Sequence, residues 1–283
     1  MEAATPDAIY ANLSTPVFPL WGIVLLLVVV LPCSAFAGYL FGRSLYRARR
    51  YDLSPPKSLP GETTLGATLA LLGLMIAFVF GFAINWGDRR VVAVTEEAAA
   101  LGTAFLRADY VAEPGRSELR GIIFEYARTR APADGGPTSP NEVAETVRET
   151  MIAQAKLWPA TIRATGGDTS DPVKIYVAGG VTDVLDAHTR RIAALSEPIP
   201  VVTKLMMLGA AMGALFLVGN NSALRGRTLT WRTFVFAALL AIVMLVILDI
   251  EQPHEGLIRL NEDALRVAIA EMEAAIAAET ATR

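Results

Sequence analysis

Four long apolar runs divide the chain into regions of different character. A helix needs about 20 mostly apolar residues to cross about 30 Å of hydrocarbon. The four runs, in chain order, are Val17–Leu40, Thr63–Gly87, Leu205–Leu224 and Thr233–Leu248, the last extended by Trp231 and Ile250. Each approaches or meets the required length and carries no charged residue. The pattern therefore predicts four transmembrane helices.

The long segment between the second and third runs has the periodicity of packed helices. Its first apolar residues step by four and three positions, the spacing of a helix seam. These residues are Val94, Ala98, Leu101, Phe105 and Ala108. No helix-breaking residue separates this seam from the second run, so one continuous helix is expected there.

Further helices are predicted after Glu113-Pro114, from Ser139-Pro140 and from Asp171-Pro172. Ser139 can accept a hydrogen bond from an unpaired amide, and Pro140 suits the first helical turn. The apolar faces of the second and fourth insert helices are Leu119, Ile122, Ile123 and Tyr126, and Val177, Val181, Val184, His188, Ile192 and Leu195. A last amphipathic helix is expected over 255–280, with Leu265, Ile269, Met272 and Ile276 on one side. There is no convincing alternating strand pattern.

The predicted fold is all-α: a four-helix transmembrane protein with a helical extramembrane insert between spans 2 and 3. The expected regions are an N-terminal tail with the first span and a basic loop (1–63), the second span (64–87), the insert (88–200), the third and fourth spans (201–250), and an acidic amphipathic C-terminal helix (251–283). We see no tandem repeat.

Composition and loop charge add an orientation. Charged residues make up 19% of the chain, below the about 25% of ordinary soluble domains. Basic residues gather in the two short loops, at Arg43, Arg47, Arg49, Arg50 and Lys57 and at Arg225, Arg227 and Arg232. Short loops rich in Lys and Arg stay in the cytoplasm. Both termini and the insert are therefore predicted to lie outside.

Candidate chemistry is sparse. The net charge of −3 and the lack of a basic aromatic patch argue against nucleic-acid binding. His188 lies on an apolar seam, where a packing role is favoured over a ligand or base. His254 lies between Glu251 and Glu255, and this cluster reads as a solvated acidic tail in preference to a cation site. Cys33 has no partner for a disulfide, and no phosphate loop, zinc helix or nucleophile elbow occurs. No catalytic residue, metal site or cofactor is predicted, and the protein is not expected to be an enzyme.

Two of the apolar runs carry small residues at four-residue spacing. Such residues let helix backbones approach closely in lipid, which supports either tight bundling or oligomerisation. The residues concerned are Gly73, Ala77 and Gly81 in the second run and Gly209 and Gly213 in the third.

The second run also carries another line at four-residue spacing, which is apolar and mostly aromatic: Leu74, Phe78 and Phe82. It can face lipid, a neighbouring helix or a pore, where apolar rings gate by dewetting; packing is the commonest of these roles. The spans lack the buried charges of a coupled transporter. A passive pore needs none.

The sequence around the second run resembles the bacterial bestrophin-like family (the DUF4239 group). The residues that carry this resemblance are Thr64–Leu74, Ala77-Phe78, Trp86–Arg90, Glu96–Ala98, Leu101–Ala104, Leu106-Arg107 and Arg116–Arg120. The resemblance implies a multi-pass protein of the bacterial cytoplasmic (inner) membrane. Its more distant relation to true bestrophins, which are pentameric anion channels with a pore-lining second helix, implies an oligomeric ion channel in which Leu74, Phe78 and Phe82 form the neck. Bestrophins keep the insert in the cytoplasm, whereas the charge pattern here predicts it outside.

Two hypotheses follow. The first is an oligomeric ion channel, a homo-oligomer in the lipid bilayer with the second span around the axis. The alternative is a non-catalytic membrane scaffold or accessory subunit, which docks membrane-protein partners through its extramembrane helices.

Overall fold

The described residues of the computed structural model are 20–49, 62–131, 140–196, 199–251 and 261–282, and they contain helices and no strand. The all-α prediction is thus confirmed. The chain forms two compact units. Unit 2 comprises 17–85 and 198–258, and unit 1 comprises 86–197 and 259–283 together with the first 16 residues.

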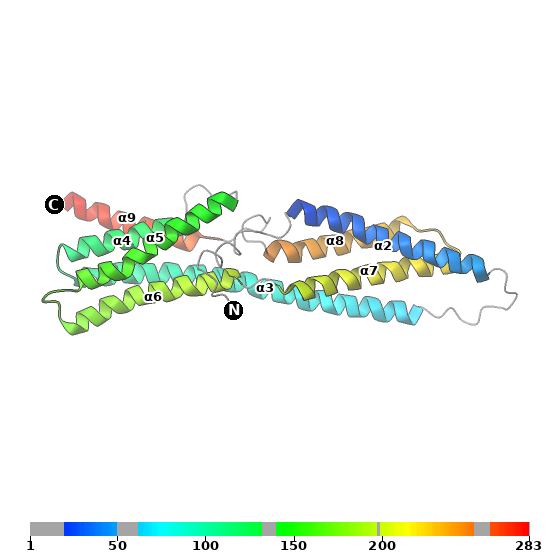
Figure 1. Ribbon diagram of the computed structural model, residues 1–283, viewed down its shortest axis with the longest axis horizontal. Coiled ribbons are helices and arrows are strands. Elements are labelled where there is room, and N and C mark those ends of the chain that lie inside the picture. The colour runs from blue at the N-terminus through cyan, green and yellow to red at the C-terminus, as the bar shows by residue number, and fades with distance from the viewer. Residues whose placement is uncertain (1–19, 50–61, 132–139, 197–198, 252–260, 283) are drawn as a thin grey trace, which may run out of the picture. The chain divides into compact units, whose positions relative to one another are not determined.

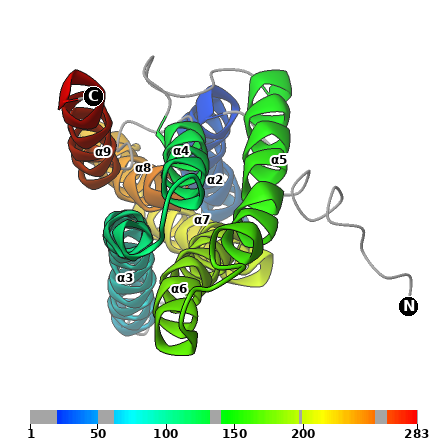
Figure 2. The ribbon, with the colours of Figure 1, turned by 90° about the vertical axis from the view of Figure 1, so that its left-hand side faces the viewer.

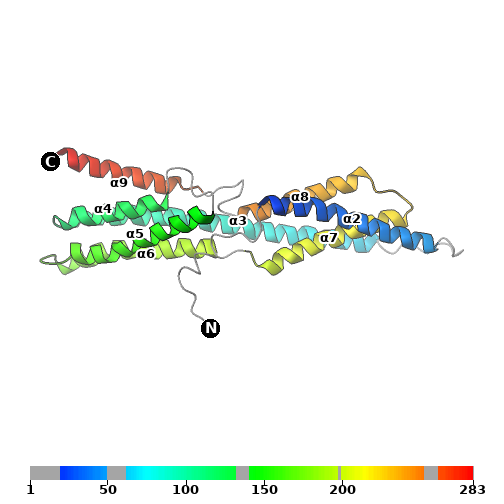
Figure 3. The same ribbon diagram turned by 45° about the horizontal axis from the view of Figure 1, so that its top comes forward.

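Unit 2 contains three complete helices and the first part of a fourth. The complete ones are α2 (Leu20–Arg49), α7 (Val201–Leu224) and α8 (Trp231–Glu251). The fourth is α3 (Glu62–Arg107), which the boundary between the units divides after Asn85. Figure 3 shows α2, α7 and α8 side by side. Their shared core includes Leu27, Leu31, Met207, Leu215 and Ile247.

The tightest contact in unit 2 joins α2 to α7 through glycines. A Cβ placed on Gly38 would lie 2.0 Å from the carbonyl oxygen of Phe216, and one on Gly219 would lie 1.9 Å from that of Ala35. The hydroxyl of Ser34 also donates a 2.6 Å hydrogen bond to the carbonyl of Met212. The two backbones therefore touch, at positions where no larger residue fits.

The described residues of unit 1 form a bundle of the second part of α3 with four further helices, seen end-on in Figure 2. A short 3-10 turn, η1 (Ala108–Tyr110), follows α3. The other helices are α4 (Gly115–Arg130), α5 (Pro140–Ala164), α6 (Asp171–Ser196) and α9 (Asp263–Thr282). Ser139, the expected cap of α5, and most of the segment before α9 lie outside the described residues.

The core of unit 1 follows the seams seen in the sequence. All five seam residues of α3 and η1 are buried, from Val94 to Ala108. Leu119, Ile123 and Tyr126 of α4 are fully buried, and so is Val177 of α6. Leu265 and Met272 attach α9 to the same core. Apolar burial at helical spacing therefore accounts for the bundle.

Among the described residues, four helices are long and apolar enough to cross a membrane, as the four apolar runs predict. They correspond to α2, α3, α7 and α8, labelled in Figure 1. The candidate span in α3 covers 48 residues, Thr63–Tyr110. At 1.5 Å per residue this length is more than twice the hydrocarbon thickness. The uncharged stretch ends at Gly87, close to the boundary after Asn85 where α3 passes from unit 2 into unit 1.

Candidate functional site

The apolar line on α3 is exposed. Leu74, Phe78 and Phe82 expose 54%, 61% and 62% of their surface, whereas Leu72 and Val79 on the same helix are buried. Four-residue spacing places the three exposed residues on one face. Unit 2 therefore packs against another face of α3 and leaves this line uncovered by its own chain.

The predicted packing glycines also face away from their own chain. A Cβ placed on Gly73, Gly81, Gly209 or Gly213 would meet no heavy atom within 4 Å, and Ala77 is exposed. Bundling within the chain instead uses Gly38 and Gly219, as described above. The sequence signal for this pair was the four-residue spacing of Ser34, Gly38 and Gly42, which our sequence analysis missed.

A buried acid in unit 2 was also missed. Asp249 lies near the end of α8 and exposes only 2% of its surface, within the candidate span Trp231–Ile250. Its carboxylate is therefore shielded from solvent.

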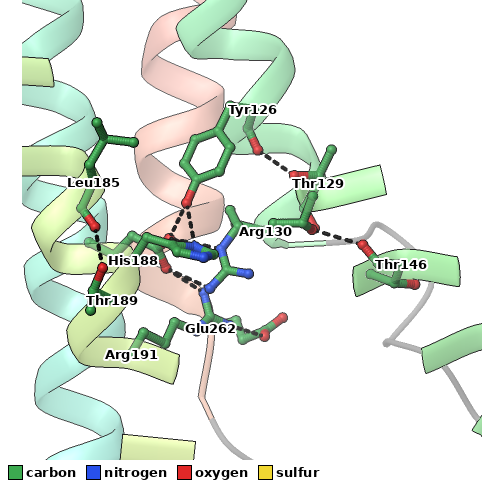
Figure 4. A network of polar contacts seen from close by, with 11 residues as sticks. Tyr126, Thr129, Arg130, Thr146, Leu185, His188, Thr189, Arg191 and Glu262 are labelled. Atoms are coloured by element: carbon green, nitrogen blue, oxygen red, sulfur yellow. Dashed lines mark hydrogen bonds and ion pairs between the residues drawn. The ribbon is translucent and has the colours of Figure 1, made fainter. Parts of the chain in front are cut away.

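The densest polar site of unit 1 is a buried group of six residues, which we call the Glu97 cluster. Its members come from α3, α4, α6 and the residue just before α9. They are Glu97, Tyr126, Arg130, His188, Arg191 and Glu262. Figure 4 shows the labelled members converging on one point between the helices.

Glu97 is the centre of the cluster, and its side chain is fully buried. Its Oε1 accepts hydrogen bonds from the Tyr126 hydroxyl at 2.7 Å and from Nε of Arg130 at 2.8 Å. Its Oε2 accepts from Arg191 at 2.8 Å and from the second Arg130 nitrogen at 3.2 Å. Four charge-assisted or polar bonds thus compensate one buried charge.

The electrostatics of Glu97 follow from two opposing causes. Burial raises the pKa of its carboxyl, but Arg130 and Arg191 lower it through their charges and hydrogen bonds. The net result is a pKa of about 2, below the ordinary 4.5. Glu97 is therefore ionised at neutral pH, and its own negative charge raises the pKa of Tyr126 further above the level set by burial.

His188 completes the interior of the cluster. Its Nδ1 lies 3.0 Å from the Tyr126 hydroxyl. That hydroxyl donates its only proton to Glu97, so it accepts from Nδ1–H and fixes this tautomer of the neutral ring. Burial lowers the pKa of His188 to about 4, and the charges of Arg130 and Arg191 lower it too, while Glu97 opposes them. The packing role expected for His188 thus includes a hydrogen bond to a buried polar group.

Helical spacing brings the cluster together. Tyr126 and Arg130 are four residues apart on α4, and His188 and Arg191 are three apart on α6, so each pair shares a helix face. Glu97 lies between the seam residues Val94 and Leu101, where a carboxylate is unusual. These spacings were readable in the sequence, but the partnership among three helices was not.

No group of three or more metal-ligating residues occurs in the described part of the chain. His254 and Glu255, the acidic tail position considered above, lie outside it. An open surface pocket of about 370 Å³ in unit 1 is lined by residues that include Phe124, Arg128 and Glu149. The described residues therefore offer an exposed apolar face on α3 and a buried charge cluster as their candidate functional features.

Comparison with known proteins agrees with the resemblance. No curated protein sequence matches the chain. The profile of the Bestrophin-like domain matches residues 40–265, well over half of the chain. This range includes the exposed line on α3, Gly219 of the α2–α7 contact and all six residues of the Glu97 cluster. The chain therefore belongs to the bestrophin-like family of membrane proteins.

Proposed function

We propose that this protein is an oligomeric ion channel in which the membrane half of α3 surrounds the pore. The observation that carries the proposal is the exposure of Leu74, Phe78 and Phe82 on one face of α3. Among the four candidate spans, α3 also buries the smallest share of its apolar window, 17%, against 44% for α8. A helix so little covered by its own chain has the surface to contact other copies.

The chemistry of the line suits a gate. A ring of apolar side chains narrows a pore and excludes water until it widens. The open glycines Gly73 and Gly81 lie about 100° around the helix from Leu74 and Phe82, respectively. They would let neighbouring α3 helices approach beside the apolar line. Membership of the bestrophin-like family supports the same reading.

The test is ion flux through purified protein in lipid bilayers. Phe78→Ala and Phe82→Ala should raise the flux at least several-fold, because a smaller side chain leaves a wider apolar ring. Phe80→Ala is the matched control, since Phe80 is also exposed, at 37%, but lies about 200° around the helix from both residues. Absence of flux from wild type and all variants would contradict the proposal.

A second candidate function is a scaffold that docks partner proteins through unit 1. Ile175 and Tyr176 of α6 favour it, because they expose 74% and 46% of their surface outside the candidate spans. Isolation in mild detergent should then recover a stoichiometric partner, and Ile175→Asp should remove it. A homo-oligomer with nothing attached argues against a scaffold.

We propose further that unit 1 and both termini lie on the outer side of the cytoplasmic membrane. The basic residues in the two short loops favour this orientation. Ser170 is exposed and suits a labelling test. In a Cys33→Ser background, Ser170→Cys should react with an impermeant thiol reagent on intact cells. Reaction only after cell lysis would reverse the orientation.

A further inference from the structure

Arg191 joins the C-terminal helix to the Glu97 cluster. One of its terminal nitrogens donates to Glu97 at 2.8 Å, and the other donates to Glu262 at 3.0 Å. The carbonyl of Glu262 also accepts the amides of Leu265 and Arg266, which start α9. Loss of the Arg191 contact would therefore act directly on the first turn of α9.

The other described attachments of α9 are apolar and ionic. Leu265, Ala268 and Met272 are its buried apolar residues. Near its other end, Glu279 pairs with Arg120 of α4. The described contacts that hold this 20-residue helix thus include one apolar face and two ionic pairs, so the Arg191–Glu262 pair contributes to its attachment.

His188 occupies the interior of this arrangement and is neutral there. The titratable or charged groups that face it are Glu97 from α3, Tyr126 and Arg130 from α4, Arg191 from its own helix α6, and beyond Arg191 the carboxylate of Glu262. A proton on His188 would add a third cation beside two guanidinium groups. Because Nδ1 already carries a hydrogen, the proton would bind at Nε2, and the charged ring would attract Glu97, whose Oε1 lies 3.9 Å from Nδ1.

We propose that the Glu97 cluster is an acid-sensitive contact: proton uptake at His188 breaks the link from Arg191 to Glu262 and releases α9 from unit 1. At neutral pH the cluster holds α9 in place. The proposal stands on the geometry of the cluster and does not depend on channel activity.

Proton linkage sets the size of the effect. In the closed cluster the pKa of His188 is about 4, and in a hydrated, open one it returns toward 6.5. The open state then binds more protons at acid pH, and its population relative to the closed state rises about 20-fold between pH 7 and pH 5. The same change in pH leaves Glu97 ionised, since its pKa is about 2.

Hydrogen exchange of α9 measures this opening directly. In full-length protein in lipid nanodiscs, protection of the α9 amides should fall about 20-fold from pH 7 to pH 5, after correction for the intrinsic rate. The α2 amides serve as an internal reference and should keep their protection. Equal protection of α9 at both values of pH would overturn the proposal.

Variants separate this mechanism from general acid lability. His188→Gln keeps an N–H donor for Tyr126 but cannot take up a proton, so α9 should lose its pH response. Glu262→Gln weakens the link itself, and α9 should exchange faster at pH 7 as well. Lys156→Gln breaks an exposed pair with Glu125 and is the matched control, with the wild-type response. A wild-type pH response in His188→Gln would assign the proton to another group and overturn the proposal. If His188→Gln does not fold, unchanged α9 exchange in Glu262→Gln at pH 7 would do the same.

Discussion

Units 1 and 2 are both helical bundles, but different forces specify their contacts. In unit 2, α2 and α7 meet at Gly38 and Gly219, where the backbones touch. In unit 1, a buried carboxylate and two arginines join three helices. Lipid is as apolar as the helices, so close packing must specify their association. In water apolar burial drives assembly, and a buried ionic cluster adds specificity at a cost in desolvation.

The largest expected effect is in unit 1. Glu97→Gln leaves Arg130 and Arg191 buried without their common carboxylate. Removing one partner of a buried ion pair costs about 3–5 kcal/mol. Unfolding of unit 1 in urea should shift accordingly, as followed by fluorescence of a variant whose only tryptophan is Trp158. An unchanged urea midpoint would mean that the carboxylate of Glu97 does not stabilise unit 1.

The corresponding change in unit 2 is steric. Gly219→Ala places a Cβ 1.9 Å from the carbonyl of Ala35, so α2 and α7 must separate. Overpacking of this kind costs about 1–3 kcal/mol or more. The thermal midpoint in detergent should fall clearly.

Gly209→Ala is the control for this change, because it makes the same substitution on the same helix where nothing lies within 4 Å. Its midpoint should stay close to that of the wild type. Equal losses from the two variants would show that the glycine at 219 has no special place in the α2–α7 contact.

Acid should destabilise unit 1 more than unit 2. The folded pKa of His188 is about 4, against 6.5 for a free side chain, so the unfolded chain binds more protons as pH falls through this range. Unit 1 should therefore lose about 2 kcal/mol between pH 7 and pH 5. Glu97, with its pKa lowered to about 2 from 4.5, adds a further loss below pH 4.5. Single-tryptophan variants retaining Trp158 or Trp231 would report on units 1 and 2, and parallel acid curves would contradict the distinction.

The two units also differ in how far the sequence predicts them. Helical periodicity located the seam from Val94 to Ala108, because burial of a face repeats every three to four residues. The four apolar runs were located by their uncharged length of about 20 residues. Periodicity could not decide which small residues pack inside the chain. Gly209 and Gly219 lie on the same helix, and only the crossing of α2 and α7 distinguishes them. The Glu97 cluster was harder still, because its members lie up to 165 positions apart, from Glu97 to Glu262.

The smallest expected effect tests whether the Glu97 cluster stabilises unit 1 because it is buried and not only because it is charged. Arg163 of α5 pairs with Glu118 of α4 at 2.7 Å, but both side chains are exposed, at 56% and 42%. Solvent screens such a pair, whose contribution is about 0.2–1 kcal/mol. Arg163→Gln should therefore shift the urea midpoint of unit 1 far less than Glu97→Gln does, although both remove an ion pair between helices. A shift of equal size would mean that exposed and buried ion pairs stabilise unit 1 equally. The difference from the backbone contact of unit 2 would then come from charge and not from burial.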